Sequence, residues 1–109
     1  LKYNMETYKK IQVVKGIVEQ YVNDNISSVQ GVVTVEDINH IVNIGTSILC
    51  TKWNIGILGG GFVEAVVNNN LSQAVSRADG TNIKALRLYC QMMYNTSLPS
   101  ELYDTSIVG

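Results

Sequence analysis

The chain is poor in the residues that build metal centres. Its 109 residues include only two cysteines, one histidine, one proline and one tryptophan. Cys50 and Cys90 have no Cys-x-x-Cys spacing, and His40 is the single imidazole, so the clustered ligands that zinc requires are missing. We therefore predict no metal site. Each cysteine falls on an apolar helix face, which predicts two buried free thiols.

The sequence also lacks a recognisable catalytic constellation. His40 has no Ser, Cys or carboxylate at a spacing that would pair with it, which predicts a solvated or locally hydrogen-bonded side chain. No carboxylate pair accompanies it. We predict no catalytic residue and no cofactor, and hence a protein that is not an enzyme.

Charge and long apolar runs are scarce as well. Eight basic residues balance nine acidic ones, for a formal net charge of −1, so binding to nucleic acid or to an anionic membrane is not expected. No apolar run reaches the ~18 residues that cross a bilayer, and no cationic segment with a cleavage site opens the chain. These features predict a soluble protein of the cytoplasm, with no membrane partner.

What the chain has in abundance is helical periodicity. A proline-free segment from Tyr3 to about Asp24 shows apolar residues at three- and four-residue steps, and Gly16 within it suggests a close helix crossing. Its apolar positions are Tyr8, Ile11, Val14, Ile17, Val18, Tyr21 and Val22. A second helix should begin after Thr34, which forms a capping box with Asp37, and should end near Trp53. Its apolar positions are Ile38, Ile41, Val42, Gly45, Ile48 and Leu49.

Three further helices are expected after a tight connection at residues 54–61. Gly59, Gly60 and Gly61 predict a chain reversal with positive φ. The helices should cover 62–68, 71–78 and 81–95, and the first two are only about two turns long. The apolar positions of the last are Ile83, Leu86, Leu88, Tyr89, Met92 and Met93. The capping residues should be Asn70, with Gln73 three residues on, and Asp79, with Asn82 three residues on.

These elements predict an all-α, compact single-domain bundle of about five helices, two of them short. Within residues 1–109 we distinguish an N-terminal helix and loop extension (1–34), a core (35–104) and a tail (105–109).

The C-terminal half offers one tentative ligand site. Gly60 and Gly61 precede a helix whose N-terminus could attract an anion. Arg77 could form an ion pair with Asp79 or Glu64, or bind a ligand together with Lys84 and Arg87, the basic cluster of this half. An aromatic and thioether set suits the core or a subunit interface, and so favours a homo-oligomer. This set comprises Trp53, Tyr89, Met92, Met93 and Tyr94.

Residues 59–100 resemble a widespread family of small phage and prophage proteins of unknown function, with a Gly-Gly-Phe, Asn-Asp-Leu, Arg-Ala-Asp-x-x-Asn signature. The matching residues are Gly60, Gly61, Phe62, Ala65, Val66, Asn69, Leu71, Ala74, Arg77, Ala78, Asp79, Asn82, Tyr94, Asn95, Pro99 and Ser100. The chain departs from the family at Leu58 and Gly59, often two prolines there, and at Asn70, usually Asp there. The resemblance covers about residues 51–104 and implies a phage origin and a compact helical domain, but no activity.

Three functional hypotheses follow. The first is a small phage-encoded binding protein that forms a homo-oligomer and acts on a host or phage factor in the host cell cytoplasm. The second is a sponge that sequesters a defence signalling nucleotide, with Gly60, Gly61, Arg77, Lys84 and Arg87 around its phosphates. The third is a structural component of the virion.

Overall fold

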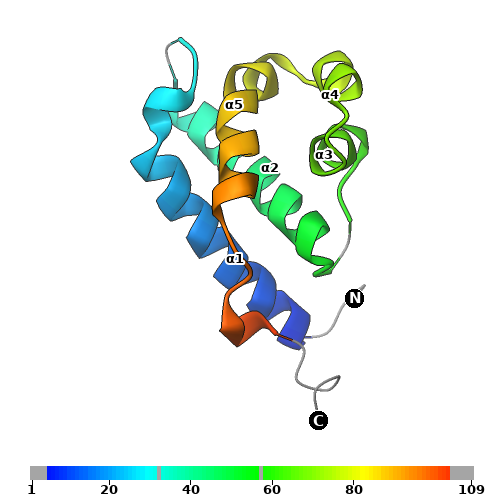
Figure 1. Ribbon diagram of the computed structural model, residues 1–109. Helices are drawn as coiled ribbons and strands as arrows, with labels where there is room; N and C mark the ends of the chain where they lie inside the picture. The colour runs from blue at the N-terminus through cyan, green and yellow to red at the C-terminus, as the bar shows by residue number, and fades with distance from the viewer. Residues whose placement is uncertain (1–4, 32, 57, 104–109) are drawn as a thin grey trace.

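The computed structural model describes residues 5–31, 33–56 and 58–103. Over these residues the fold is all-α, without strands, which confirms the predicted class of helical bundle (Figure 1). The elements are α1 (Met5–Asp24), η1 (Ile26–Ser28), α2 (Val35–Trp53), α3 (Gly61–Val67), α4 (Leu71–Arg77), α5 (Gly80–Asn95) and η2 (Ser100–Leu102). The helix start predicted at Tyr3 lies outside the described residues, and the other helix ends predicted from the sequence agree within one residue. The tail expected at 105–109 lies outside the described residues.

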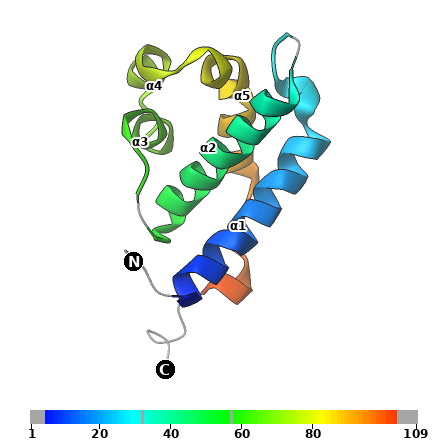
Figure 2. The ribbon, with the colours of Figure 1, turned by 180° about the vertical axis from the view of Figure 1, so that it is seen from behind.

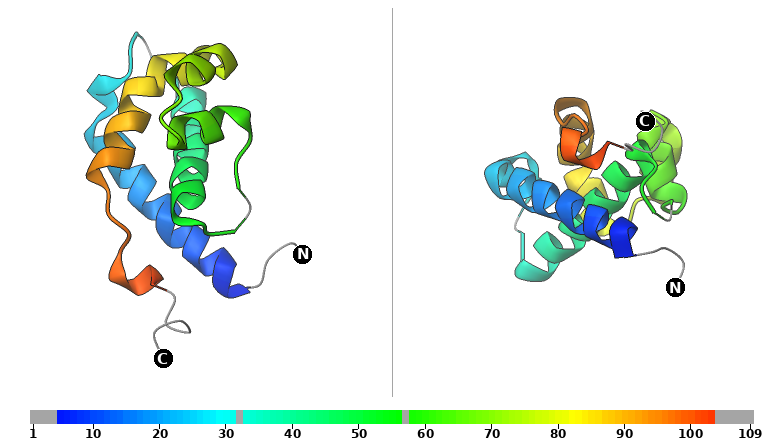
Figure 3. Two further views of the ribbon diagram at one scale, coloured as in Figure 1. Left: turned by 45° about the vertical axis from the view of Figure 1, so that its right-hand side comes forward. Right: turned by 90° about the horizontal axis from the view of Figure 1, so that it is seen from below.

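The helix α2 is the centre of the bundle. It packs against α1, α3 and α5, while α4 packs mainly on α3. Seen from behind, α1 and α2 lie side by side along most of their length (Figure 2). The two short helices sit on the far side of α2 from α1, and η2 returns to the start of α1 (Figure 3).

The core is built from the inward faces of α1, α2, α3 and α5. Its largest fully buried side chains are Val14, Val18, Val22, Ile41, Ile48, Leu49, Leu88, Tyr89 and Met92. The ring of Tyr89 meets that of Phe62 edge-on, with centroids 6.0 Å apart and planes at 66°, a favoured aromatic geometry. The Tyr89 hydroxyl donates to Oδ1 of buried Asn82 at 2.8 Å, so this polar pair is satisfied inside the core.

Two glycines have roles that the sequence did not predict. Gly16 does not mark a close crossing, because it is exposed and a Cβ added there would meet no atom within 4 Å. The close crossing is at Gly45 of α2, where an added Cβ would lie 2.8 Å from Cγ1 of Val18 and 3.3 Å from Cε of Met92. Gly45 therefore lets α1 and α5 both approach α2.

The prediction that the glycines at 59–61 reverse the chain through positive φ is wrong. Gly60 has φ −78°, and positive φ occurs instead at Gly31, Gly56, Asn54 and Asn69. Gly59 is required for space, because an added Cβ would lie 2.6 Å from both Oγ of Ser47 and Cγ1 of Val63. An added Cβ at Gly61 would collide with the Arg77 side chain. Close approach therefore explains Gly59, whereas the flexible Arg77 side chain could move away from a side chain at Gly61.

The predicted caps hold the helix starts. Thr34 and Asp37 form the expected capping box of α2, with N–H to oxygen distances of 3.0 and 3.1 Å. Asn70 accepts from the Gln73 N–H at 3.2 Å, but its own N–H bonds the Ala65 carbonyl, so the box predicted there is half formed. Asp79 caps α5 by accepting from the Asn82 N–H at 2.7 Å.

Several predicted faces need correction. Asn82 contributes only its backbone N–H to the cap, since its side chain faces Tyr89. Tyr8 and Ile83, assigned to apolar faces, are 46% and 42% exposed. Cys90 is also exposed, whereas Cys50 is buried as predicted. The true inward face of α5 consists of Asn82, Ala85, Leu88, Tyr89 and Met92, which turns the Ile83 and Cys90 side outward.

Candidate functional site

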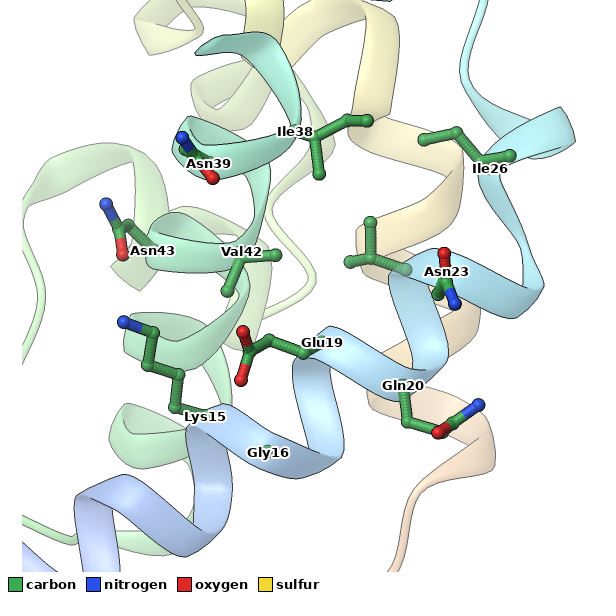
Figure 4. Close-up of a pocket in the computed structure, with 11 residues that line it drawn as sticks. Lys15, Gly16, Glu19, Gln20, Asn23, Ile26, Ile38, Asn39, Val42 and Asn43 are labelled. Carbon is green, nitrogen blue, oxygen red and sulfur yellow. The ribbon is translucent and has the colours of Figure 1, made fainter. Parts of the chain in front are cut away.

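A groove of about 680 Å³ runs between α1 and α2 (Figure 4). It combines an apolar floor with a polar rim. Its lining residues are Lys15, Gly16, Glu19, Gln20, Val22 and Asn23 of α1, Ile26 of η1, and Ile38, Asn39, Val42 and Asn43 of α2. The groove is concave and within the size range of ligand-binding clefts, and such clefts are where ligands bind most often.

Helical spacing explains how α2 supplies both the floor and one rim. Ile38 and Val42 are four residues apart and so share a face of α2. Asn39 and Asn43 each follow one of them, which rotates their amides toward the outer edge of the same groove (Figure 4). The sequence thus places two amides one turn apart beside two apolar side chains.

The opposite rim comes from α1. Lys15 and Glu19, four residues apart, extend toward α2 from the two sides of Gly16 (Figure 4). Gly16 also lines the groove, and a Cβ added there would meet no atom within 4 Å. The groove therefore offers one cation, one anion and two amides over an apolar floor.

These polar groups are not used by the fold. Of the polar lining residues, Gln20 bonds Asp24 at 3.0 Å. Within the described part of the chain, Lys15, Glu19, Asn23, Asn39 and Asn43 have no side-chain hydrogen bond or ion pair to the protein. Their donors and acceptors are free to bind a ligand.

The tentative phosphate site predicted from the sequence is spread over two places. Arg77 packs over Gly61 at the start of α3, next to exposed Gly60. Lys84 lies on α5, close enough to Asp37 at the start of α2 to lower the pKa of that carboxyl. Arg87 is exposed on α5. None of the five residues lines the α1–α2 groove.

The expected ion pair of Arg77 with Asp79 or Glu64 does not occur among the described residues. Asp79 is already engaged, since its Oδ1 accepts from the Asn82 N–H and its Oδ2 lies 2.9 Å from Nε2 of His40. His40 thus has a carboxylate partner that the sequence did not indicate. Burial disfavours ionisation of Asp79, but the hydrogen bonds from Asn82 and His40 outweigh it and keep its pKa below 3.8.

A second polar contact mirrors the first. The Thr81 hydroxyl of α5 donates to Oδ1 of Asp37 on α2, at 3.1 Å. Hydrogen bonds from the Thr34 backbone N–H, the Thr34 side chain and the Thr81 hydroxyl lower the pKa of Asp37. They outweigh the effect of burial and hold this pKa below 3.8. In each of the two carboxylates, one oxygen accepts a backbone N–H at the start of its own helix. The other oxygen contacts a side chain of the other helix.

Neither the cysteines nor the other potential metal ligands of the described residues form a reactive or metal-binding site. Burial raises the pKa of the Cys50 thiol to about 11 and also raises that of Cys90, so both are thiols rather than thiolates at neutral pH. The described residues contain no group of three or more His, Cys, Asp or Glu side chains that could hold a metal ion. In the same part of the chain, no helix is long and apolar enough to cross a membrane.

A scan against protein-family models, a search of curated proteins and a search of solved structures each returned no match to this chain. Function must therefore be inferred from the groove and from the surfaces of the bundle. The residues that line the groove were missed at the sequence level, because a groove depends on how α1 crosses α2. The signal present in the sequence is the pair of amides at Asn39 and Asn43 beside the apolar stripe.

Proposed function

We propose that the chain is a small phage-encoded, non-enzymatic binding protein, which acts on a host or phage factor in the cytoplasm of the infected cell. The resemblance of residues 59–100 supports the phage origin. The α1–α2 groove supports binding, and we propose that it holds an extended polypeptide segment of that factor. The observation that carries this proposal is the set of unpartnered polar side chains around an apolar floor.

The chemistry of the rim suits a peptide backbone. A side-chain amide carries both donors and an acceptor, as a peptide group does. Asn39 and Asn43 are about 5–6 Å apart by helical geometry, close to the roughly 6.6 Å between alternate residues of an extended chain. The two amides can therefore bond successive peptide groups that face the same way.

The other groove residues would select the side chains of the segment. Ile38 and Val42 form an apolar floor for side chains that point inward. Lys15 and Glu19 present opposite charges on one rim, which would orient a segment carrying charge of both signs.

The geometry gives less support to the nucleotide sponge. Three of its five residues, Gly60, Gly61 and Arg77, meet at the start of α3, whereas Lys84 and Arg87 lie on α5. The α1–α2 groove offers one cation, Lys15, beside the anion Glu19. A phosphate bound in the groove would be attracted by Lys15 and repelled by Glu19. The virion hypothesis is decided separately by mass spectrometry of purified particles, where absence of the chain excludes it.

Substitution of Gly16 provides a sharp test. A peptide library displayed on a surface is selected against the wild-type protein, and the recovered peptides are measured against Gly16→Leu and Gly16→Ala. The leucine adds bulk to the groove lining and should leave the fold intact, since a Cβ added at Gly16 meets no atom within 4 Å. Gly16→Ala is the matched control for the change in helix propensity.

We expect Gly16→Leu to lose binding while Gly16→Ala retains it, with NMR shift changes confined to the residues lining the groove. Peptides that bind Gly16→Leu as well as they bind wild type would refute the proposal. Failure to recover any peptide above the Gly16→Leu background would also refute it.

A further inference from the structure

The outer surface of α1 carries a shallow groove of its own, beside the α1–α2 groove. Its lining residues are Val13, Gly16, Ile17, Gln20, Tyr21 and Asp24. They recur at steps of three and four residues, so they form one stripe along the helix. We call these six residues the outer α1 face. Helix α1 runs along the edge of the bundle, and among the described residues no other element lines this groove (Figure 2).

The centre of the outer α1 face is apolar and open. Val13, Ile17 and Tyr21 are half-buried, so each leaves part of its side chain in solvent. Gly16 is exposed, and a Cβ added there would meet no atom within 4 Å. A glycine at this position lets another surface approach the helix backbone closely.

The charges of α1 are separated along the helix. Before Gly16 the helix has a formal charge of +2 and after it −2, so the helix as a whole is neutral. The charged residues are Glu6, Lys9, Lys10 and Lys15 on the first side, and Glu19 and Asp24 on the second. Asp24 is the last residue of α1, and the last turn has no basic residue, although the helix dipole favours cations there. The position of Asp24 therefore does not stabilise α1 itself.

Contacts within the chain leave these charges largely available. Among the described residues, Lys9 has no ion pair or side-chain hydrogen bond. The Lys10 ammonium lies 3.9 Å from the exposed Glu6 carboxylate, and such pairs contribute little to stability. The Asp24 carboxylate accepts hydrogen bonds from the neutral amide of Gln20, which leaves its charge unpaired.

We propose that a second copy of this chain covers the outer α1 face, with the two α1 helices antiparallel. A two-fold axis near Gly16 places the basic half of each helix against the acidic half of the other. Lys9 and Lys10 then lie near Asp24 of the second copy, and Val13 lies near Tyr21 of the second copy. The apolar centres meet between the two sets of charges.

The separation of charge favours a second copy over other partners. An uncharged surface would leave both halves of α1 unpaired, and a surface of one charge would be repelled by one half. A parallel copy would bring like charges together, so the pattern also fixes the orientation. Association through this face does not require a peptide in the α1–α2 groove, although Gly16 and Gln20 line both grooves.

Charge reversal on α1 tests directly for a second copy. Lys9→Glu/Lys10→Glu changes the formal charge of α1 from zero to −4, and Glu19→Lys/Asp24→Lys changes it to +4. The first pair adds acidic side chains toward the helix start and the second adds a basic one to the last turn. The helix dipole favours both changes, so both variants should fold, which circular dichroism checks.

The matched control changes charge on another helix. Lys84 and Arg87 are exposed on α5, outside the outer α1 face. Lys84→Glu/Arg87→Glu alters the net charge of the chain by as much as Lys9→Glu/Lys10→Glu does, but leaves α1 unchanged.

Analytical ultracentrifugation over a concentration series gives the mass of each protein. We expect wild type and the α5 control to associate. Each α1 variant alone should dissociate at least about tenfold more readily, because like charges then meet across the interface. An equimolar mixture of the two α1 variants should associate again as a one-to-one complex, because opposite charges then meet.

A single-chain mass for wild type at every concentration overturns the proposal. It is equally overturned if either α1 variant alone associates as tightly as wild type, or if the mixture remains single chains. Loss of association in the α5 control would place the interface elsewhere and so contradict it too.

Discussion

Nε2 of His40 lies 2.9 Å from Oδ2 of Asp79, 39 residues further along the chain. The contact joins α2 to the cap of α5, and the Thr81 hydroxyl joins α5 to the cap of α2 through Asp37. The two helix starts thus exchange one hydrogen bond in each direction. We therefore expect the stabilities of the two helix starts to be coupled.

This exchange predicts different outcomes for two substitutions of Asp79. Asp79→Ala removes the cap and the partner of His40, and should lower the free energy of unfolding by about 1 kcal/mol or somewhat more. Asp79→Asn keeps a good capping side chain and should cost less. Urea denaturation measures both.

A double-mutant cycle with His40→Ala isolates the contact between the helices. Both side chains are partly exposed, so we expect a coupling energy of roughly 0.5 kcal/mol. A coupling energy of zero would show that the 2.9 Å contact adds nothing to the cap.

Stability should fall in acid because of the two capping carboxylates. The pKa of Asp37 and that of Asp79 are lower in the folded chain than the ordinary value of 3.8. Such groups stabilise the fold at every pH above 3.8, and this contribution is lost as the pH falls through the lower, folded values. The urea midpoint should therefore drop on acidification, and by less in Asp37→Asn/Asp79→Asn. An equal drop in that variant would assign acid sensitivity to other carboxylates.

The same glycine-to-alanine change should have opposite effects at two sites. Gly16→Ala meets open space and should raise stability by up to about 1 kcal/mol through better helix propensity. Gly45→Ala places a methyl group against Val18 and should cost about 1–3 kcal/mol by overpacking, partly offset by the same propensity gain. Thermal unfolding of the two variants compares them directly, and a stabilised Gly45→Ala would contradict the tight crossing.

The buried pair in the core predicts a non-additive result. Tyr89→Phe leaves Oδ1 of Asn82 without its donor and should cost about 1–3 kcal/mol. In an Asn82→Ala background the same change should cost less, because no acceptor is left unsatisfied. Equal costs in the two backgrounds, measured by chemical denaturation, would show that the hydrogen bond itself is not important.

Local signals in the sequence located the helices well. The caps at Thr34, Asn70 and Asp79 act within three or four residues, so their hydrogen bonds are visible in the sequence pattern. Periodicity was less reliable for choosing the inward face of α5. Its apolar residues surround much of the helix, and the packing of α2 and α3 decides that Tyr89 is buried and Ile83 is not.

Contacts between distant segments could not be predicted in this way. His40 and Asp79 meet because two helix starts are brought together by the bundle. Gly16 and Gly45 look alike in the sequence, and only the position of the neighbouring helices distinguishes open space from a tight crossing. The α1–α2 groove is hidden for the same reason, since neither of its rims is a site without the other.

The attachment of α4 to the bundle has a consequence for its dynamics. This seven-residue helix packs mainly on α3, which is equally short, so neither would persist alone in water. Local opening of α4 should therefore require much less free energy than global unfolding, and its amide protons should exchange with deuterium sooner than those of α5.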